Sequence, residues 1–153
     1  MPKKRNFMGE SLEDYTEAIY ELEKKNGLAR VTDISNRLSV SKPSVTEALS
    51  ILKEKGIIIY SPYKPINLTP KGKSLAKKIK KKHDILRDFL EKILKVESEK
   101  AKIYACKMEH ILEKEMVDRL YILAKKLFNS QFYKNFEKDL KMTGKKNGWT
   151  DKT

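Results

Sequence analysis

The stretch VTDISNRLSVSKPSVTEALSILKEKGIIIYSPYKPINLTP, residues 31–70, determines the fold class predicted for this chain. Thr32 is placed to cap a short helix, and Ser41 to cap a second helix in which Pro43 takes an early position that needs no N–H donor. Gly56 ends the second helix. Two amphipathic helices joined by a short connection predict a helix-turn-helix.

Two strand-like segments follow the helix pair. Residues 57–60 and 66–69 are rich in β-branched and aromatic side chains, and the residues between them, SPYKP, are typical of a turn. Helix, turn, helix and two-stranded hairpin is the order of a winged helix-turn-helix, in which the second helix of the pair enters the DNA major groove. We therefore expect the hairpin, called the wing, to lie along the DNA backbone.

A further helix is predicted ahead of this stretch, from about Leu12 to Lys25. Apolar residues recur there at helical spacing, and Ser11 with Asp14 resembles a capping box in which Asp replaces Glu or Gln. Gly27 favours the end of this helix, because glycine tolerates the left-handed cap conformation. Three helices and a wing therefore make up the predicted N-terminal part.

The second helix of the pair offers hydroxyls, lysines and one acid on its polar face. Hydroxyls bond to phosphates or base edges, and a glutamate can accept from cytosine N4, although an ordinary amphipathic helix has a similar outer face. The wing tip and the start of the preceding helix add further polar groups. We expect the DNA-contacting residues to be Arg30, Thr32, Ser41, Lys42, Ser44, Thr46, Glu47, Lys53, Tyr63 and Lys64.

Long helices are predicted beyond Pro70. One keeps an apolar stripe to about Lys95, a second follows Ser98, and a third has apolar residues at heptad-like spacing over 116–127. Residues 129–153 predict a short helix and a frayed tail. Helices that follow a winged domain usually build a homodimer, which suits the two-fold symmetry of DNA operators.

The chain is strongly basic, with 34 Lys+Arg against 21 Asp+Glu and a formal net charge of +13. A surplus of lysine can be a solvated surface, but it also favours a polyanionic partner such as double-stranded DNA. Lys3, Lys4 and Arg5 are placed to reach the DNA backbone or minor groove. Because 36% of residues are charged, no membrane association is expected, and the single cysteine predicts no internal disulfide and a cytoplasmic location.

Cys106, Glu109 and His110 fall on one turn of a predicted helix. A thiolate, a carboxylate and an imidazole at this spacing can reach one divalent ion, with other ligands supplied by other helices. The alternative is a small apolar cysteine beside two surface residues. Asp14 and Glu17, taken alone, fit a solvated helix face, and His83 alone fits a surface or packed histidine.

Six motifs, found in matching order over about residues 10–128, resemble the diphtheria-toxin-repressor and manganese-transport-regulator family. They are residues 11–20 (SLEDYTEAIY), 29–34 (ARVTDI), 43–46 (PSVT), 68–72 (LTPKG), 82–86 (KHDIL) and 106–110 (CKMEH). The resemblance implies a dimeric, metal-dependent repressor that binds operators of metal-uptake genes. It implies the metal ligands Asp14, Glu17, His83, Cys106, Glu109 and His110.

This ligand set mixes two branches of the family. Asp14 and Glu17 resemble the manganese-sensing branch, whereas Cys106 resembles the iron-sensing branch. Carboxylates suit Mn²⁺ and a thiolate adds affinity for softer ions, so we expect Mn²⁺ first and Fe²⁺ next, with Co²⁺, Zn²⁺ or Cd²⁺ binding in vitro. We also expect the shorter, manganese-type architecture, without the third domain that iron-sensing members carry.

The expected fold class is mainly α. It comprises a winged helix-turn-helix domain at residues 1–72, an all-α metal-binding and dimerisation domain at 73–142 and a flexible tail at 143–153. One alternative is a metal-independent winged-helix regulator that senses a small molecule, although no small organic ligand is expected. An enzyme with Cys106 as nucleophile and His110 as base is disfavoured, because no oxyanion donor or substrate loop is visible.

Overall fold

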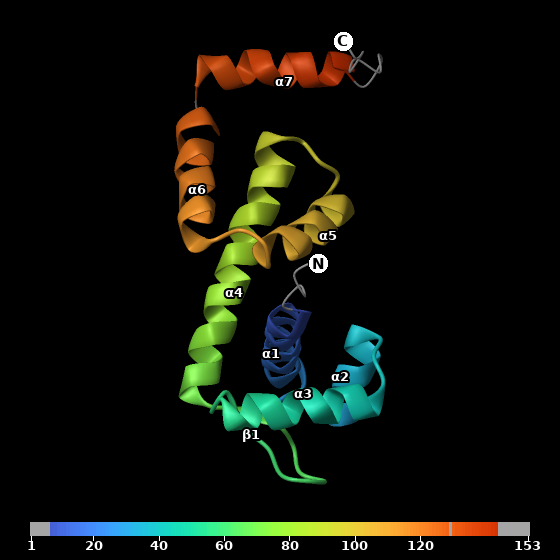
Figure 1. Ribbon diagram of the computed structural model, residues 1–153. Coiled ribbons are helices and arrows are strands. Elements are labelled where there is room, and N and C mark those ends of the chain that lie inside the picture. The colour runs from blue at the N-terminus through green and yellow to red at the C-terminus, as the bar shows by residue number, and fades with distance from the viewer. Residues whose placement is uncertain (1–6, 129, 144–153) are drawn as a thin grey trace, which may run out of the picture. The chain divides into compact units, whose positions relative to one another are not determined.

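The computed structural model describes residues 7–128 and 130–143 and is mainly α-helical, as predicted (Figure 1). It divides into two compact units, Met1–Lys81 and Lys82–Thr153. The division falls within helix α4 (Pro70–Asp88), whereas the predicted domain boundary lies near the start of that helix and stays a prediction. None of the helices in the described ranges is long and apolar enough to cross a membrane.

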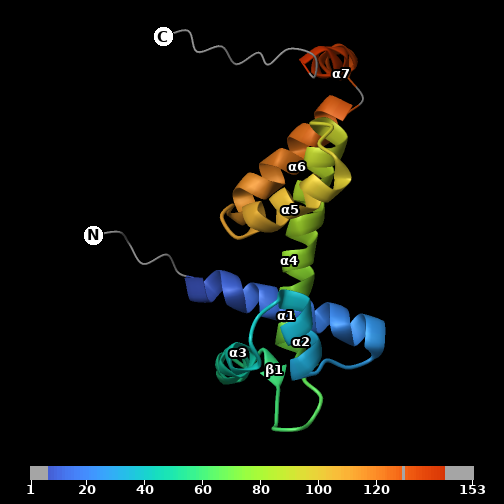
Figure 2. The same ribbon diagram turned by 90° about the vertical axis from the view of Figure 1, so that its right-hand side faces the viewer.

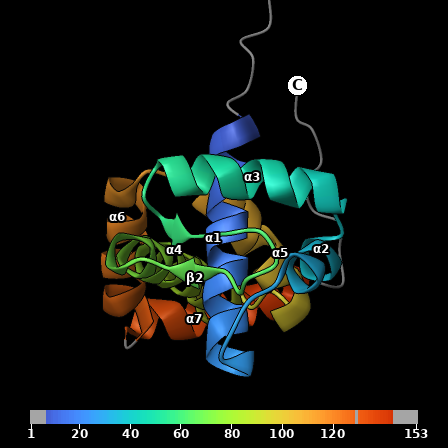
Figure 3. The ribbon, with the colours of Figure 1, turned by 90° about the horizontal axis from the view of Figure 1, so that it is seen from below.

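The first unit is the predicted winged helix-turn-helix. Its elements are α1 (Phe7–Asn26), α2 (Val31–Leu38), α3 (Lys42–Glu54), β1 (Ile58–Ile59) and β2 (Asn67–Leu68), followed by the start of α4. The strands pair antiparallel, with Ile58 opposite Leu68. Figure 3 shows α3 lying across α1, and the fully buried Ile19, Ile34 and Leu49 join the three helices in one core. Burial of such side chains contributes roughly 1.5–3 kcal/mol each.

Both ends of α3 follow the sequence prediction. Ser41 is the N-cap residue, and its side chain accepts a hydrogen bond from the Ser44 amide at 3.2 Å. Pro43 lies in the first turn, where a missing N–H costs nothing. After the helix, Gly56 takes a φ of +68°, the left-handed conformation that glycine adopts without strain. The second helix of the predicted helix-turn-helix is confirmed.

The starts of α1 and α2 differ from the prediction. α1 begins at Phe7 rather than at Leu12, because no proline interrupts the preceding turn and the helix continues through position 11. The capping box expected there is therefore not the helix start. α2 begins at Val31 with Arg30, not Thr32, at the N-cap position, and no side chain caps it. Ala29 pairs with Ile66 of the wing, which holds the chain extended up to the helix start.

The wing is tied to α1 through the outer edge of β2. The Leu68 amide donates to Glu23 Oε1 at 2.9 Å, and the Ile66 amide donates to the Ala29 carbonyl at 2.9 Å. Both donors lie on the side of the strand that β1 leaves unpaired. A two-residue strand pair has little stability of its own, so these two bonds fix where the wing sits on the helices.

Replacing Glu23 with alanine is expected to lower the free energy of unfolding by about 1–3 kcal/mol, because the partly buried Leu68 amide loses its acceptor. Glu23→Gln keeps an acceptor oxygen and should lose less than half as much. Urea unfolding of both variants measures the difference. Equal losses in the two variants would show that the charge of Glu23, rather than its hydrogen bond, holds the wing.

The start of α4 packs directly on β1. Thr69 donates its amide and its hydroxyl to the Ile57 carbonyl, each at 3.0 Å. A Cβ added at Gly72 would lie 2.1 Å from that carbonyl oxygen, so no other residue fits there without a shift of the backbone. The wing and α4 are therefore in backbone contact.

All of the regular elements in the described part of the second unit are helices. After the end of α4 come the π-helical turn η1 (Phe89–Ile93), α5 (Ser98–Glu109), α6 (Lys114–Phe128) and α7 (Gln131–Thr143). Leu86, Leu90 and Val117 form its core together with two alanines of α5. The prediction of one regular helix to Lys95 is wrong in detail. The wider turn of η1 interrupts the α-helix after Asp88, and Lys95, with φ +56°, turns the chain away.

The short helix predicted near the C-terminus is α7. Its buried Tyr133 donates a hydrogen bond from its hydroxyl to the Lys92 carbonyl, which attaches α7 to the end of η1. The predicted tail beyond this helix and the basic residues Lys3, Lys4 and Arg5 lie outside the described residues.

Candidate nucleic-acid interface and metal centre

All of the predicted DNA-contacting residues are exposed on the first unit. They are Arg30, Thr32, Ser41, Lys42, Ser44, Thr46, Glu47, Lys53, Tyr63 and Lys64. The Thr46 hydroxyl donates to the Lys42 carbonyl at 3.0 Å, and the Ser41 and Ser44 hydroxyls are 2.8 Å apart. The Thr46 oxygen therefore presents lone pairs outward, which suits the amino groups of cytosine and adenine in the major groove.

A hollow of about 540 Å³ separates the start of α3 from the wing. Its lining includes three cationic side chains, Arg30, Lys42 and Lys64, with Thr46 on one wall and Tyr63 on the other. Figure 2 shows the loop between β1 and β2 extending past α3. The positive charge of this lining complements the negative charge of a sugar–phosphate strand.

Glu109 is the central residue of a second cluster, in the second unit. Its side chain is 0% exposed although it carries a carboxylate. Glu109 Oε2 lies 2.8 Å from Nδ1 of His83, which α4 supplies. α5 turns its two alanines and Glu109 inward, because these residues recur every four positions along the helix.

The other carboxylate oxygen of Glu109 has no hydrogen-bond partner among the described residues. His110 Nε2 lies 3.7 Å from it, within ion-pair range but too far for a hydrogen bond. The half-buried Cys106 places its Sγ within 4.8 Å of a ring nitrogen of His110. A buried carboxylate oxygen without a hydrogen-bond partner is costly. Because two imidazoles lie beside this carboxylate and a thiol lies near one of them, the cluster fits a divalent cation.

The remaining two predicted ligands belong to the first unit. Asp14 and Glu17 lie one turn apart on α1, and both are half-buried rather than fully solvated. The second unit thus brings together His83, Cys106, Glu109 and His110, whereas α1 carries the other two.

Sequence reasoning missed the role of Glu23 and the burial of Glu109. Glu23 bonds to an amide 45 positions away, so no local pattern reveals it. Glu109 was expected only as one of three ligand-capable residues on one helical turn, and the structure shows that it lies on the buried face of α5 beside two alanines.

These features define a class of protein. A winged helix-turn-helix with an exposed, basic face, joined to a helical unit in which side chains able to bind a metal gather around a buried carboxylate, has the features of a DNA-binding regulator that responds to a cation.

Family models place the chain within that class. Residues 8–66 match "Iron dependent repressor, N-terminal DNA binding domain", and residues 69–129 match "Iron dependent repressor, metal binding and dimerisation domain". The chain belongs to this family, which is the diphtheria-toxin-repressor and manganese-transport-regulator family that the sequence motifs resemble. It is a metal-dependent, DNA-binding transcriptional regulator that forms a homodimer, and it is not an enzyme.

Similar proteins agree with this assignment. The chain is 38% identical over 120 residues to an uncharacterised HTH-type regulator, MJ0568, of Methanocaldococcus jannaschii, covering 78% of this chain and 96% of the relative. It is 38% identical over 110 residues to the HTH-type transcriptional regulator MntR of Bacillus subtilis, covering 72% and 77% of the two chains.

Solved structures show the same fold. The manganese regulator SloR has a TM-score of 0.66 at 28% identity, and IdeR of T. acidophilum has 0.64 at 28% identity. The matches cover 74% and 71% of this chain but only 53% and 51% of those chains, so this chain spans about half the length of these solved relatives.

Proposed function

We propose that this protein is a manganese-responsive repressor that binds operator DNA of metal-uptake genes as a homodimer in the cytoplasm. Fe²⁺ is the second candidate for its metal. The observation that carries the proposal is the fully buried Glu109, whose Oε1 lacks a hydrogen-bond partner in the described part of the chain. Two imidazoles lie beside its carboxylate, and the Cys106 thiol lies near one of them.

The proposed ligands are Asp14 and Glu17 from the first unit and four residues from the second. The four are His83, Cys106, Glu109 and His110. Three carboxylates favour Mn²⁺, and relatives that carry the name MntR support that choice. Cys106 adds a softer ligand, so Fe²⁺ is retained and Co²⁺, Zn²⁺ or Cd²⁺ should bind in vitro.

α1 has a double role in this proposal. It carries Asp14 and Glu17, and it also holds the reading face, because Ile19 packs in the core with α3 and Glu23 holds the wing. When bound, an ion would supply positive charge to the carboxylates among these ligands. Ligands that hold α1 in one position therefore also hold the recognition helix α3 and the wing. A homodimer can then present its two recognition helices about 34 Å apart, which is one turn of DNA.

Titrating Mn²⁺ into the protein while measuring its affinity for duplex DNA tests the proposal. The probe is a duplex selected from a random pool by the Mn²⁺-loaded protein. We expect affinity for this duplex to rise at least tenfold with Mn²⁺, and Mn²⁺ affinity to rise by the same factor with DNA, as linkage requires. Tight DNA binding whose affinity changes with none of the divalent ions would instead favour a metal-independent regulator that senses a small molecule.

A further inference from the structure

The wing tip is a tight turn with an unexpected residue in it. The Lys64 amide donates to the Ser61 carbonyl at 3.1 Å, which closes a β-turn with Pro62 in its second position and Tyr63 in its third. Tyr63 has a φ of +64°. Proline followed by a residue with positive φ is the arrangement of a type II turn, in which glycine or asparagine normally takes the third position. A tyrosine there is strained.

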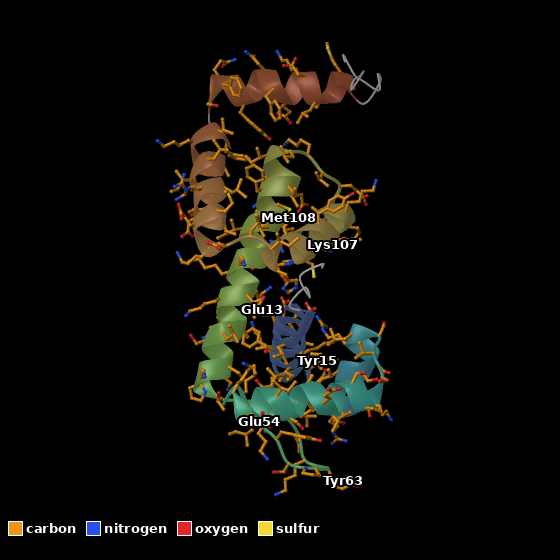
Figure 4. All side chains as sticks on the ribbon, viewed as in Figure 1. Glu13, Tyr15, Glu54, Tyr63, Lys107 and Met108 are labelled. Carbon is orange, nitrogen blue, oxygen red and sulfur yellow. The ribbon has the colours of Figure 1, made fainter. Side chains whose placement is uncertain are left out.

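The Tyr63 ring gains nothing from the rest of the protein that would offset this strain. Its relative exposure is 107%, and within the described residues it takes part in no hydrogen bond, ring contact or ion pair. Figure 4 labels Tyr63 at the end of the wing, away from the helices. Stability of the isolated chain therefore does not explain a strained, fully exposed aromatic residue at this position.

The hollow beside the wing indicates what the ring meets. With the start of α3 in the major groove, the sugar–phosphate strand that borders the groove passes next to α3. The cations Arg30, Lys42 and Lys64 line the hollow at that place. Beyond a phosphate strand lies the adjacent minor groove, and the wing tip is on that side of the hollow.

We propose that Tyr63 enters the minor groove beside the major-groove site and inserts its ring against a base step, while Lys64 contacts the bordering phosphates. This inference rests on the proposed DNA-binding function and adds a contact to it. Apolar and aromatic side chains act as wedges in minor grooves, where they unstack a base step and gain contact area. The strained turn holds the ring outward before DNA arrives, which lowers the ordering cost of binding.

Three variants of the full-length protein test this role with the selected duplex described above. Tyr63→Gly relieves the strain, so its melting temperature should equal or exceed that of the wild type while DNA affinity falls at least tenfold. Tyr63→Phe keeps the ring and should bind within about twofold of the wild type. Lys64→Gln removes a phosphate contact, so the slope of log affinity against log salt should fall by about one per subunit. The Tyr63→Gly slope should not change.

A second measurement reports the wedge itself. 2-Aminopurine placed in turn at positions flanking the selected major-groove site should brighten at one step with the wild type and Tyr63→Phe, and not with Tyr63→Gly, because unstacking removes quenching. Tyr63→Gly binding as tightly as the wild type would overturn the inference and leave the proposed function standing. Equal losses in Tyr63→Phe and Tyr63→Gly would also overturn it, in favour of a hydroxyl contact. A wild-type protein that selects no duplex would instead refute the proposed function.

Discussion

Glu109→Gln is expected to abolish metal-stimulated DNA binding in a protein that still folds. The amide has the shape of the carboxylate and can still bond to His83, which lies 2.8 Å away. It has no charge to offer a cation. In the metal-free protein the substitution removes a buried charge whose Oε1 has no hydrogen-bond partner among the described residues, so stability without metal should be unchanged or higher.

Added metal should stabilise the wild type but not the variant. Mn²⁺ at 100 times its dissociation constant should stabilise the wild type by about 2.7 kcal/mol, and Glu109→Gln by close to zero. Thermal unfolding with and without Mn²⁺, followed by DNA titration, measures both effects. Glu113→Gln, at an exposed position four residues further on, is the matched control and should behave as the wild type. His110→Ala should match Glu109→Gln in the DNA assay, with salt-sensitive nonspecific binding retained in both.

A full Mn²⁺-dependent shift in Glu109→Gln would remove this carboxylate from the metal site. Loss of the shift in Glu113→Gln as well would mean that the acidic charge of the region, rather than a particular ligand, is responsible.

Ile103→Glu is expected to convert the dimer to a monomer. Large exposed apolar residues concentrate in the second unit and are Leu94, Ile103, Tyr104, Ile111, Met116, Tyr121, Ile122, Leu123, Phe128, Phe132 and Met142. Only Ile59 and Tyr63 of the described residues are comparable in the first unit. Such a concentration of exposed apolar side chains marks a contact surface. Residues 69–129 match the dimerisation model and include the outer face of α5, where Ile103 is 55% exposed.

A glutamate at this face should place two like charges in the interface. Sedimentation should then show half the mass, and DNA affinity should fall by about 10²–10⁴, because the second half-site is no longer bound intramolecularly. Met142→Glu is the control: Met142 is exposed but lies beyond the matched residues, so the variant should remain dimeric. An Ile103→Glu protein that stays dimeric with full DNA affinity would place the interface elsewhere.

Local signals account for the parts of the fold that were predicted correctly. A capping serine, an early proline and a terminal glycine each act within one turn of helix, so Ser41, Pro43 and Gly56 defined α3 without tertiary information. Thr32 carried a similar signal but is not the cap. The pairing of Ala29 with Ile66 set the start of α2 instead, and a contact across 37 positions leaves no trace in a short window.

The metal centre was only partly predictable for a similar reason. The resemblance named the ligand types, but hydrophobic periodicity assumes that apolar faces turn inward. α5 departs from this assumption, because Ile103 and Tyr104 are exposed while Glu109 is buried beside two alanines. A cation would stabilise the buried carboxylate, and a second subunit would cover the apolar face. When a cation covers one face of a helix and a second subunit covers the other, hydrophobicity alone does not predict which face turns inward.

The contact at Gly72 has a mechanical consequence. No side chain lies between α4 and the Ile57 carbonyl, and Thr69 donates a hydrogen bond to the same oxygen. The start of α4 and the wing are therefore tightly packed against each other. We therefore expect a small rotation of the first turn of α4 to move the wing with it. A methyl group at position 72 would push α4 away from the Ile57 carbonyl. The helix and the wing should each stay folded but should no longer move together.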